Sequence, residues 1–105
     1  MIKYASGLSD ELADIASYFA QYNEAIAERF LDNCEVTFDL LERFPDSGSP
    51  RRFEDPELAS VRMTLVKGFD EYLIFYVPIA GGVRILHVMH SSLDYNRIVD
   101  ADDLR

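Results

Sequence analysis

The residues that could bind a metal ion or attack a substrate are two histidines, an aspartate and one cysteine. His87 and His90 lie three residues apart, and Asp94 is the only further ligand candidate close to them. On the strand expected there, an odd spacing places the two imidazoles on opposite faces, which disfavours a shared metal ion. Cys34 falls on an apolar helical stripe and has no second cysteine with which to bind zinc or form an internal disulfide. We therefore expect no metal, no cofactor and no catalytic nucleophile, and we interpret both histidines as structural.

Basic and aromatic side chains form a second group of candidate site residues, suited to binding a partner. Arg51, Arg52 and Phe53 follow one another in a turn-rich loop, where two cations and an aromatic ring could anchor a protein. Further candidates are spread over the second half of the chain: Arg62, Lys67, Arg84, Tyr95 and Arg97. The alternative for these cations is a solvated surface position, because Arg and Lys are mostly exposed in folded proteins.

The composition describes an acidic chain whose length suits one domain. Its 105 residues carry a net charge of −9 with a pI near 4.5, and 49% of them are hydrophobic. A surface of this charge repels phosphate groups, so we expect no direct nucleic acid binding. Residues 1–9 lack the apolar core of a signal peptide, and no run is apolar enough to span a bilayer. We expect a single cytoplasmic domain over residues 1–105, without membrane contact.

Two amphipathic helices are predicted in the first half of the chain. Ser9 precedes two acidic residues and is the expected N-cap of the first helix, which should end near Gln21. Asn23 is the expected N-cap of a second helix over residues 24–44, which Pro45 would terminate. The short connection makes the two helices an antiparallel hairpin. The second helix has an acidic face that we interpret as solvated: Asp32, Glu35, Asp39 and Glu42.

Strands are predicted at the start of the chain and throughout its second half. Residues 1–5 could form an edge strand, and residues 45–60 read as a loop inside the domain. Three strands rich in aliphatic and aromatic residues follow, joined by hairpin-length connections at residues 67–71 and 79–82: residues 61–66, 72–78 and 83–90. The tail, residues 94–105, is either a short helix or a flexible end. The predicted fold class is α+β, with the helix hairpin packed on a small antiparallel sheet of three to four strands.

The order of several short motifs resembles the ParE branch of the ParE/RelE superfamily of toxin-antitoxin systems. Two N-terminal helices lead to a Phe-Pro-x-x-Gly turn, and Arg62 then opens the first long strand. Tyr76 ends an apolar strand, and the last strand, residues 85–90, has Asp94 four positions beyond it. The likeness covers nearly the whole chain. His90 matches the motif, and we expect it to orient the chain beyond the strand through a hydrogen bond.

This resemblance implies a toxin that is neutralised by a ParD-like antitoxin in a hetero-oligomer. ParE-like members are associated with poisoning of DNA gyrase, and RelE-like members with cleavage of mRNA on the ribosome. Cleavage in the second branch needs cations that position and polarise a phosphodiester, for which this chain offers Arg62, Lys67, Arg84 and Arg97, with Tyr95 beside the last. The net charge of −9 opposes docking on ribosomal RNA, so the resemblance and the charge together favour gyrase.

Two alternatives remain beside a gyrase-directed toxin: a ribosome-dependent endoribonuclease and a non-toxic module that binds the antitoxin. Nine residues are candidates for contact with the antitoxin or the target. They are Arg51, Arg52, Phe53, Arg62, Lys67, Arg84, His90, Asp94 and Tyr95. The resemblance also makes the C-terminal tail a candidate for contact with the target.

Overall fold

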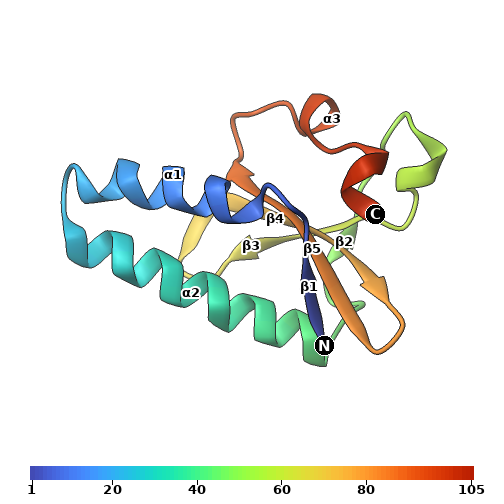
Figure 1. Cartoon of the computed structure of the whole chain (residues 1–105), viewed down its shortest axis with the longest axis horizontal. Helices are drawn as coiled ribbons and strands as arrows, with labels where there is room; N and C mark the ends of the chain where they lie inside the picture. Colours follow the sequence, from blue (N-terminus) through green and yellow to red (C-terminus); the bar gives the residue numbers. More distant parts are fainter.

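A computed structural model describes all residues, 1–105, as two helices packed on one face of a five-stranded sheet (Figure 1). The elements in chain order are β1 (Ile2–Tyr4), α1 (Leu8–Ala20), α2 (Glu24–Arg43), β2 (Ser49–Pro50), η1 (Pro56–Leu58), β3 (Arg62–Val66), β4 (Phe69–Ile79), β5 (Gly82–His90), α3 (Tyr95–Ile98) and η2 (Ala101–Leu104). The predicted α+β class and the helix hairpin are confirmed. None of the helices combines the length and apolar character that a bilayer-spanning segment needs.

The two long helices begin in different ways. Asn23 caps α2 as the sequence predicted, and its side chain accepts a hydrogen bond from the Ala25 N–H at 2.8 Å. The predicted N-cap of α1, Ser9, is wrong by two residues, because the helix starts at Leu8 with Gly7 at the N-cap and without a side-chain cap. Leu8 is only 2% exposed, and its inclusion in the helix lets it head the buried stripe.

The sheet is mixed, with the strand order β1-β5-β4-β3-β2. β3, β4 and β5 form the predicted antiparallel meander, with β4 in the centre. β1 is the predicted edge strand, but it pairs parallel to β5. The fifth strand is β2, two residues that pair with the start of β3 inside the segment that the sequence predicted as loop. The residues around β1 and β2 do not indicate either pairing. β2 has only two residues, and β1 pairs with a strand about eighty residues further along the chain.

The connection between β3 and β4 is shorter than predicted. β4 begins at Phe69, so only Lys67 and Gly68 lie between the two strands. Gly68 has a φ of +78°, a conformation that side chains disfavour, and this permits the tight turn. The predicted five-residue connection was wrong because polar Asp70 and Glu71 obscured the start of the strand.

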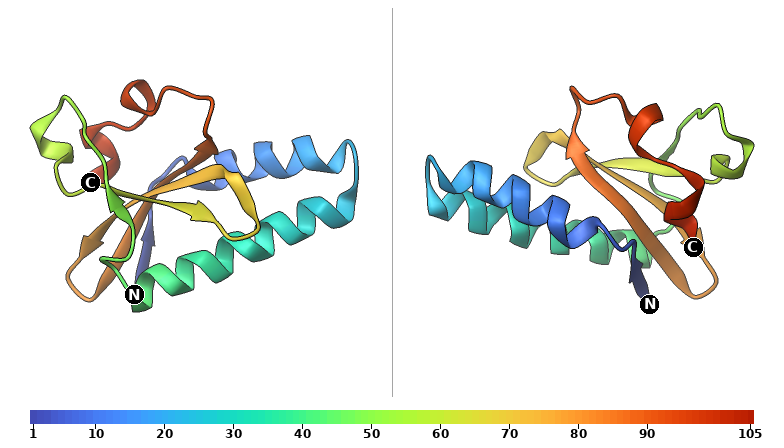
Figure 2. Two further views of the ribbon diagram at one scale, coloured as in Figure 1. Left: turned by 180° about the vertical axis from the view of Figure 1, so that it is seen from behind. Right: turned by 45° about the horizontal axis from the view of Figure 1, so that its top comes forward.

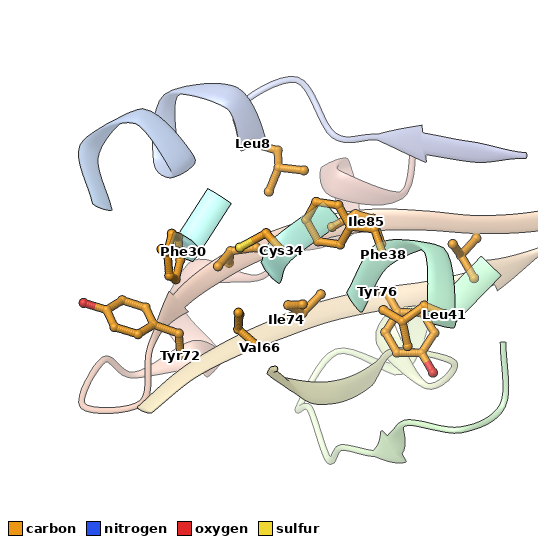
Figure 3. Packing of buried hydrophobic residues seen from close by; sticks show 12 residues of the cluster. Leu8, Phe30, Cys34, Phe38, Leu41, Val66, Tyr72, Ile74, Tyr76 and Ile85 are labelled. Atoms are coloured by element: carbon orange, nitrogen blue, oxygen red, sulfur yellow. The ribbon is translucent and has the colours of Figure 1, made fainter. Parts of the chain in front are cut away.

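Buried side chains form two clusters, one on each face of the sheet. The larger cluster lies between the sheet and the helices and includes Phe30, Cys34, Ile74 and Tyr76 (Figure 3). The smaller one is covered by the loop after β2 and by the C-terminal segment, which lie across the sheet from the helices (Figure 2). The acidic side chains predicted on α2 are exposed or half-exposed, as expected for its outer face. Both faces of β4 are therefore buried, which explains its continuous apolar sequence.

Candidate functional site

A groove of about 690 Å³ runs between α1, the β4–β5 end of the sheet and the segment that follows β5. Its apolar lining consists of Ile15, Tyr18, Phe19, Phe69, Tyr72, Val88, Met89, Leu93 and Ile98. Four acidic residues complete its wall: Glu11, Asp14, Asp70 and Glu71. His90 and Ser92 are its remaining polar residues, and neither lysine nor arginine lines it. The groove is thus apolar inside and negatively charged around its rim.

Packed aromatic rings form the floor of this groove. The ring of Phe19 lies 5.4–5.5 Å from those of Phe30, Phe69 and Tyr72. Tyr72 is buried, and burial together with the nearby Tyr18 and Glu71 raises the pKa of its phenol. Tyr18, in contrast, is 52% exposed at the edge of the groove. A floor of mutually packed rings changes shape little, so it can accept apolar side chains at low cost in entropy.

A charged bridge lies beside the groove and connects α1 to both β5 and the chain end. His87 Nδ1 contacts Glu11 Oε2 at 2.5 Å, and His87 Nε2 contacts Asp103 Oδ2 at 2.7 Å. The second oxygen of Glu11 accepts the backbone N–H of Val88 at 3.0 Å. β1 pairs with β5 only as far as Ile85, so this carboxylate satisfies the sheet edge where the neighbouring strand has ended. Glu11 therefore completes the sheet and binds the histidine.

The two carboxylates determine the protonation of His87. Burial lowers the pKa of the imidazole, but the hydrogen bonds and charges of Glu11 and Asp103 outweigh that effect and raise the pKa above its ordinary value. Both ring nitrogens face acceptor oxygens, which is the arrangement that an imidazolium satisfies.

Arg84 joins the same C-terminal contact from β5. Its Nε donates to the Asp103 carbonyl at 2.8 Å, and its Nη2 donates to the Arg105 carbonyl at 2.9 Å. Its guanidinium therefore holds the tail of its own chain. The tail itself is ordered into α3 and η2, which favours the short-helix interpretation over the flexible end.

Arg62 is also engaged within the fold. Its Nη1 donates to the Asp46 carbonyl at 3.0 Å and to the Gly48 carbonyl at 2.6 Å. The hydroxyl of Tyr76 accepts from the Gly48 N–H at 2.9 Å and donates to the Pro45 carbonyl at 2.7 Å. The motif residues of the Phe-Pro-x-x-Gly turn, the arginine and the tyrosine thus meet in one cluster that shapes the loop after α2. This placement gives Arg62 a structural function.

The other candidate residues lie apart from the groove, with one exception. Phe53 packs half-buried between Phe75 and Tyr95, with ring centroids at 6.3 and 5.3 Å, and leaves Arg52 exposed and Arg51 half-exposed. Lys67 is exposed at the β3–β4 turn. The exception is His90, which lines the groove.

His90 and Asp94 both order the chain after β5. His90 Nδ1 accepts from the Ser92 N–H at 3.0 Å, which is the hydrogen bond expected beyond the strand. The side chain of Asp94 accepts from the Asn96 N–H at 3.1 Å and so caps α3. His87 and His90 occupy different surroundings, as their odd spacing predicted. His87 contacts Asp103, whereas His90 packs edge-to-face against Tyr72 with the ring centroids 5.2 Å apart.

Sequence reasoning missed the residues of the bridge. Glu11 was interpreted only as an acid in the first turn of a helix, and Asp103 only as part of an acidic tail. Their contacts with His87 span 76 and 16 positions of sequence, respectively. The available signal was a histidine inside the apolar run of residues 85–89, because a histidine buried in such a run needs hydrogen-bond partners.

The helix hairpin on a mixed sheet, with an acidic groove and an embedded motif cluster, defines a small α+β protein. The profile of the family described as ParE toxin of type II toxin-antitoxin system, parDE, matches residues 2–95. The chain therefore belongs to the ParE toxin family, and it is the toxin component of a type II system with an antitoxin partner. No curated protein matches it.

Proposed function

We propose that this toxin is held inactive by a ParD-like antitoxin whose amphipathic segment occupies the acidic-rimmed groove, and that the free toxin inhibits DNA gyrase by binding it. The observation that carries the first part is the groove itself. Its aromatic floor suits apolar anchors spaced along one face of a helix. Its four acids, unaccompanied by lysine or arginine, favour a segment that carries basic residues beside those anchors.

Charge reversal in the groove tests the placement of the antitoxin. The antitoxin is sought in the neighbouring reading frame, as a short protein with a ribbon-helix-helix segment and a C-terminal tail. Asp14→Lys and Asp70→Lys should each weaken the complex, with a steeper loss at low salt, because exposed charges interact over about 10 Å at 0.1 M salt. Asp39→Lys, on the exposed face of α2 and outside the groove, is the matched control.

The groove assignment fails if the control weakens the complex as much as the groove variants do. If the affinity does not change with salt, the proposed pairing of basic antitoxin residues with the acids of the groove is wrong. The proposed apolar contacts with the groove floor would be unaffected by that result. Titration by isothermal calorimetry at two salt concentrations separates these outcomes.

The gyrase assignment is supported by charge and by the use of the cations inside the fold. The net charge of −9 opposes docking on ribosomal RNA. Arg62 and Arg84, two of the cations that a ribonuclease would use, each donate hydrogen bonds to backbone carbonyls of their own chain. A protein target tolerates an acidic partner, because apolar and aromatic contacts supply most of the binding energy at such interfaces.

Two assays distinguish the target hypotheses. Purified toxin should block supercoiling by gyrase, and expression without antitoxin should cause filamentation and a DNA damage response. Gyrase activity that is unchanged through a saturating titration would overturn the assignment. Codon-positioned mRNA cleavage in a translating extract, lost in Arg84→Ala, would instead establish the endoribonuclease. Harmless overexpression with tight antitoxin binding would identify a non-toxic binding module.

A further inference from the structure

The C-terminal 3-10 helix η2 is held against β5 by ionic contacts that include the bridge at His87. We propose that the Glu11–His87–Asp103 bridge is a proton-operated clasp, which fastens residues 100–105 tightly to the sheet when His87 is an imidazolium and loosens them when it is neutral. The proposal concerns a conformational change within this chain, and it is independent of the identity of the antitoxin and the target.

The chemistry of imidazole makes the bridge depend on one proton. A neutral ring has one N–H donor and one nitrogen lone pair, whereas the two carboxylates need a donor at each nitrogen. Loss of a proton would set a lone pair against a carboxylate oxygen, at 2.5 Å on the Glu11 side or at 2.7 Å on the Asp103 side. One of the two contacts must then open.

The surroundings determine that the Asp103 side opens. Glu11 belongs to the 13-residue helix α1, and its other oxygen binds the Val88 N–H. Asp103 belongs to the four-residue 3-10 helix η2, and the only other group that binds its carboxylate is the Asp100 N–H, which lies in the same short segment. The neutral ring is therefore expected to keep Glu11 and to lose Asp103.

The other charged groups around His87 do not compensate for the lost proton. Arg84, on the same strand, binds the backbone carbonyls of Asp103 and Arg105. The residue paired with His87 on β4 is Phe75, which has no titratable group. Glu11 from α1 and Asp103 from η2 are the acids that face the ring. Arg84, the Arg105–Glu57 ion pair and the partly buried Leu104 still keep the loosened segment near β5, so the change is local.

The test is an NMR titration of the full chain that follows the His87 ring together with the backbone amides of η2. The amides of Asp103 and Arg105 bond to Asp100 and Asp102, so their hydrogen exchange reports whether η2 is formed. The protection of these two amides against hydrogen exchange should fall as pH rises. The midpoint of this fall should match the midpoint of the His87 titration. The equilibrium constant for docking of η2 on β5 changes about tenfold for each unit by which docking raises the pKa of His87.

Variants distinguish the clasp from a merely structural histidine. His87→Gln cannot donate to both carboxylates, so its η2 amides should lack protection at every pH. His90→Gln should keep the pH step, because His90 bonds to Ser92 and lies near Glu71. If His87→Gln does not fold, Asp103→Asn tests the clasp from the other side and should abolish the step in a folded chain. Protection that stays constant while His87 titrates, or a step that survives Asp103→Asn, would overturn the proposal.

Discussion

Gly48 lies so close to Tyr76 that a β-carbon at position 48 would stand 2.6 Å from the phenolic oxygen. Tyr76 has no exposed surface and its hydroxyl is bonded on both sides, so the ring cannot retreat. The glycine of the turn is thus required by the tyrosine of the central strand. This relationship explains why the two residues belong to one motif although 28 positions separate them.

Gly48→Ala should therefore destabilise the protein. Overpacking beside a fixed ring typically costs about 1–3 kcal/mol in the free energy of unfolding. Gly7→Ala is the control, because a β-carbon there meets nothing within 4 Å. Urea unfolding of the two variants should show a lower midpoint for position 48 and a nearly unchanged midpoint for position 7.

Tyr76→Phe should destabilise the loop after α2 while leaving the core packed. The variant deprives the Gly48 N–H and the Pro45 carbonyl of their partner, and a buried polar group left unpaired costs about 1–3 kcal/mol. Tyr22→Phe removes a hydroxyl from a side chain that is 73% exposed and serves as the control. Equal stability of the two variants would contradict the role assigned to the Tyr76 hydroxyl.

Arg62→Ala should lower stability rather than remove a catalytic group. The guanidinium donates to two carbonyls of the loop, and hydrogen bonds from charged donors contribute about 1.5–3 kcal/mol each before solvent exposure reduces that value. Arg52→Ala, at an exposed position, should leave the unfolding midpoint unchanged. If Arg62→Ala retains full stability and yet loses toxicity, the arginine has a direct role in function.

The stability of the protein should decrease as pH rises through the titration of His87. The folded pKa is raised above the ordinary value of 6.5, so the bridge contributes fully below about 6.5 and is lost as pH rises through the folded pKa. The His87→Gln variant should lack this pH-dependent contribution to the free energy of unfolding. Subtracting its free energy of unfolding from that of the wild type between pH 5 and pH 9 isolates the component, and a difference that grows with pH would have the wrong sign.

Cys34 should resist alkylation in the folded state. The side chain is 1% exposed, and burial raises the pKa of its thiol to about 12, so almost no reactive thiolate forms at neutral pH. Reaction with iodoacetamide should accelerate in urea along the unfolding transition. Rapid modification without denaturant would show that the helix hairpin opens from the sheet.

The predictions that succeeded depend on residues that are neighbours in sequence. Asn23 caps the helix that follows it, and the apolar run at residues 72–78 was predicted as a strand and lies in β4. The turn at Gly68 was misjudged because polar residues at the start of β4 resemble a loop. The parallel pairing of β1 was missed because its partner lies about eighty residues away, and no local pattern encodes such a contact.

The candidate site likewise combines features that neighbouring residues indicate with features that depend on contacts between distant segments. The acidic balance and the helix hairpin over a sheet were visible in the sequence, and the acidic residues around the groove agree with the net charge of −9. The groove wall, in contrast, draws on α1, β4, β5 and the segment after β5, and only the folded chain brings these together. The motif of Gly48, Arg62 and Tyr76 was recognised as a pattern, but its hydrogen bonds with one loop exist only in the folded chain.

Glu11 is at once a wall residue of the groove and a partner of His87. A ligand whose cation pairs with Glu11 competes with the imidazolium for one carboxylate, and it thereby lowers the affinity of His87 for its proton. Coupling between two binding events is reciprocal, so such a ligand expels a proton as it binds and binds more tightly as pH rises through this range. Because the Glu11 carboxylate takes part in both equilibria, filling the groove with a cationic ligand and raising the pH should have the same effect: each favours the neutral form of His87.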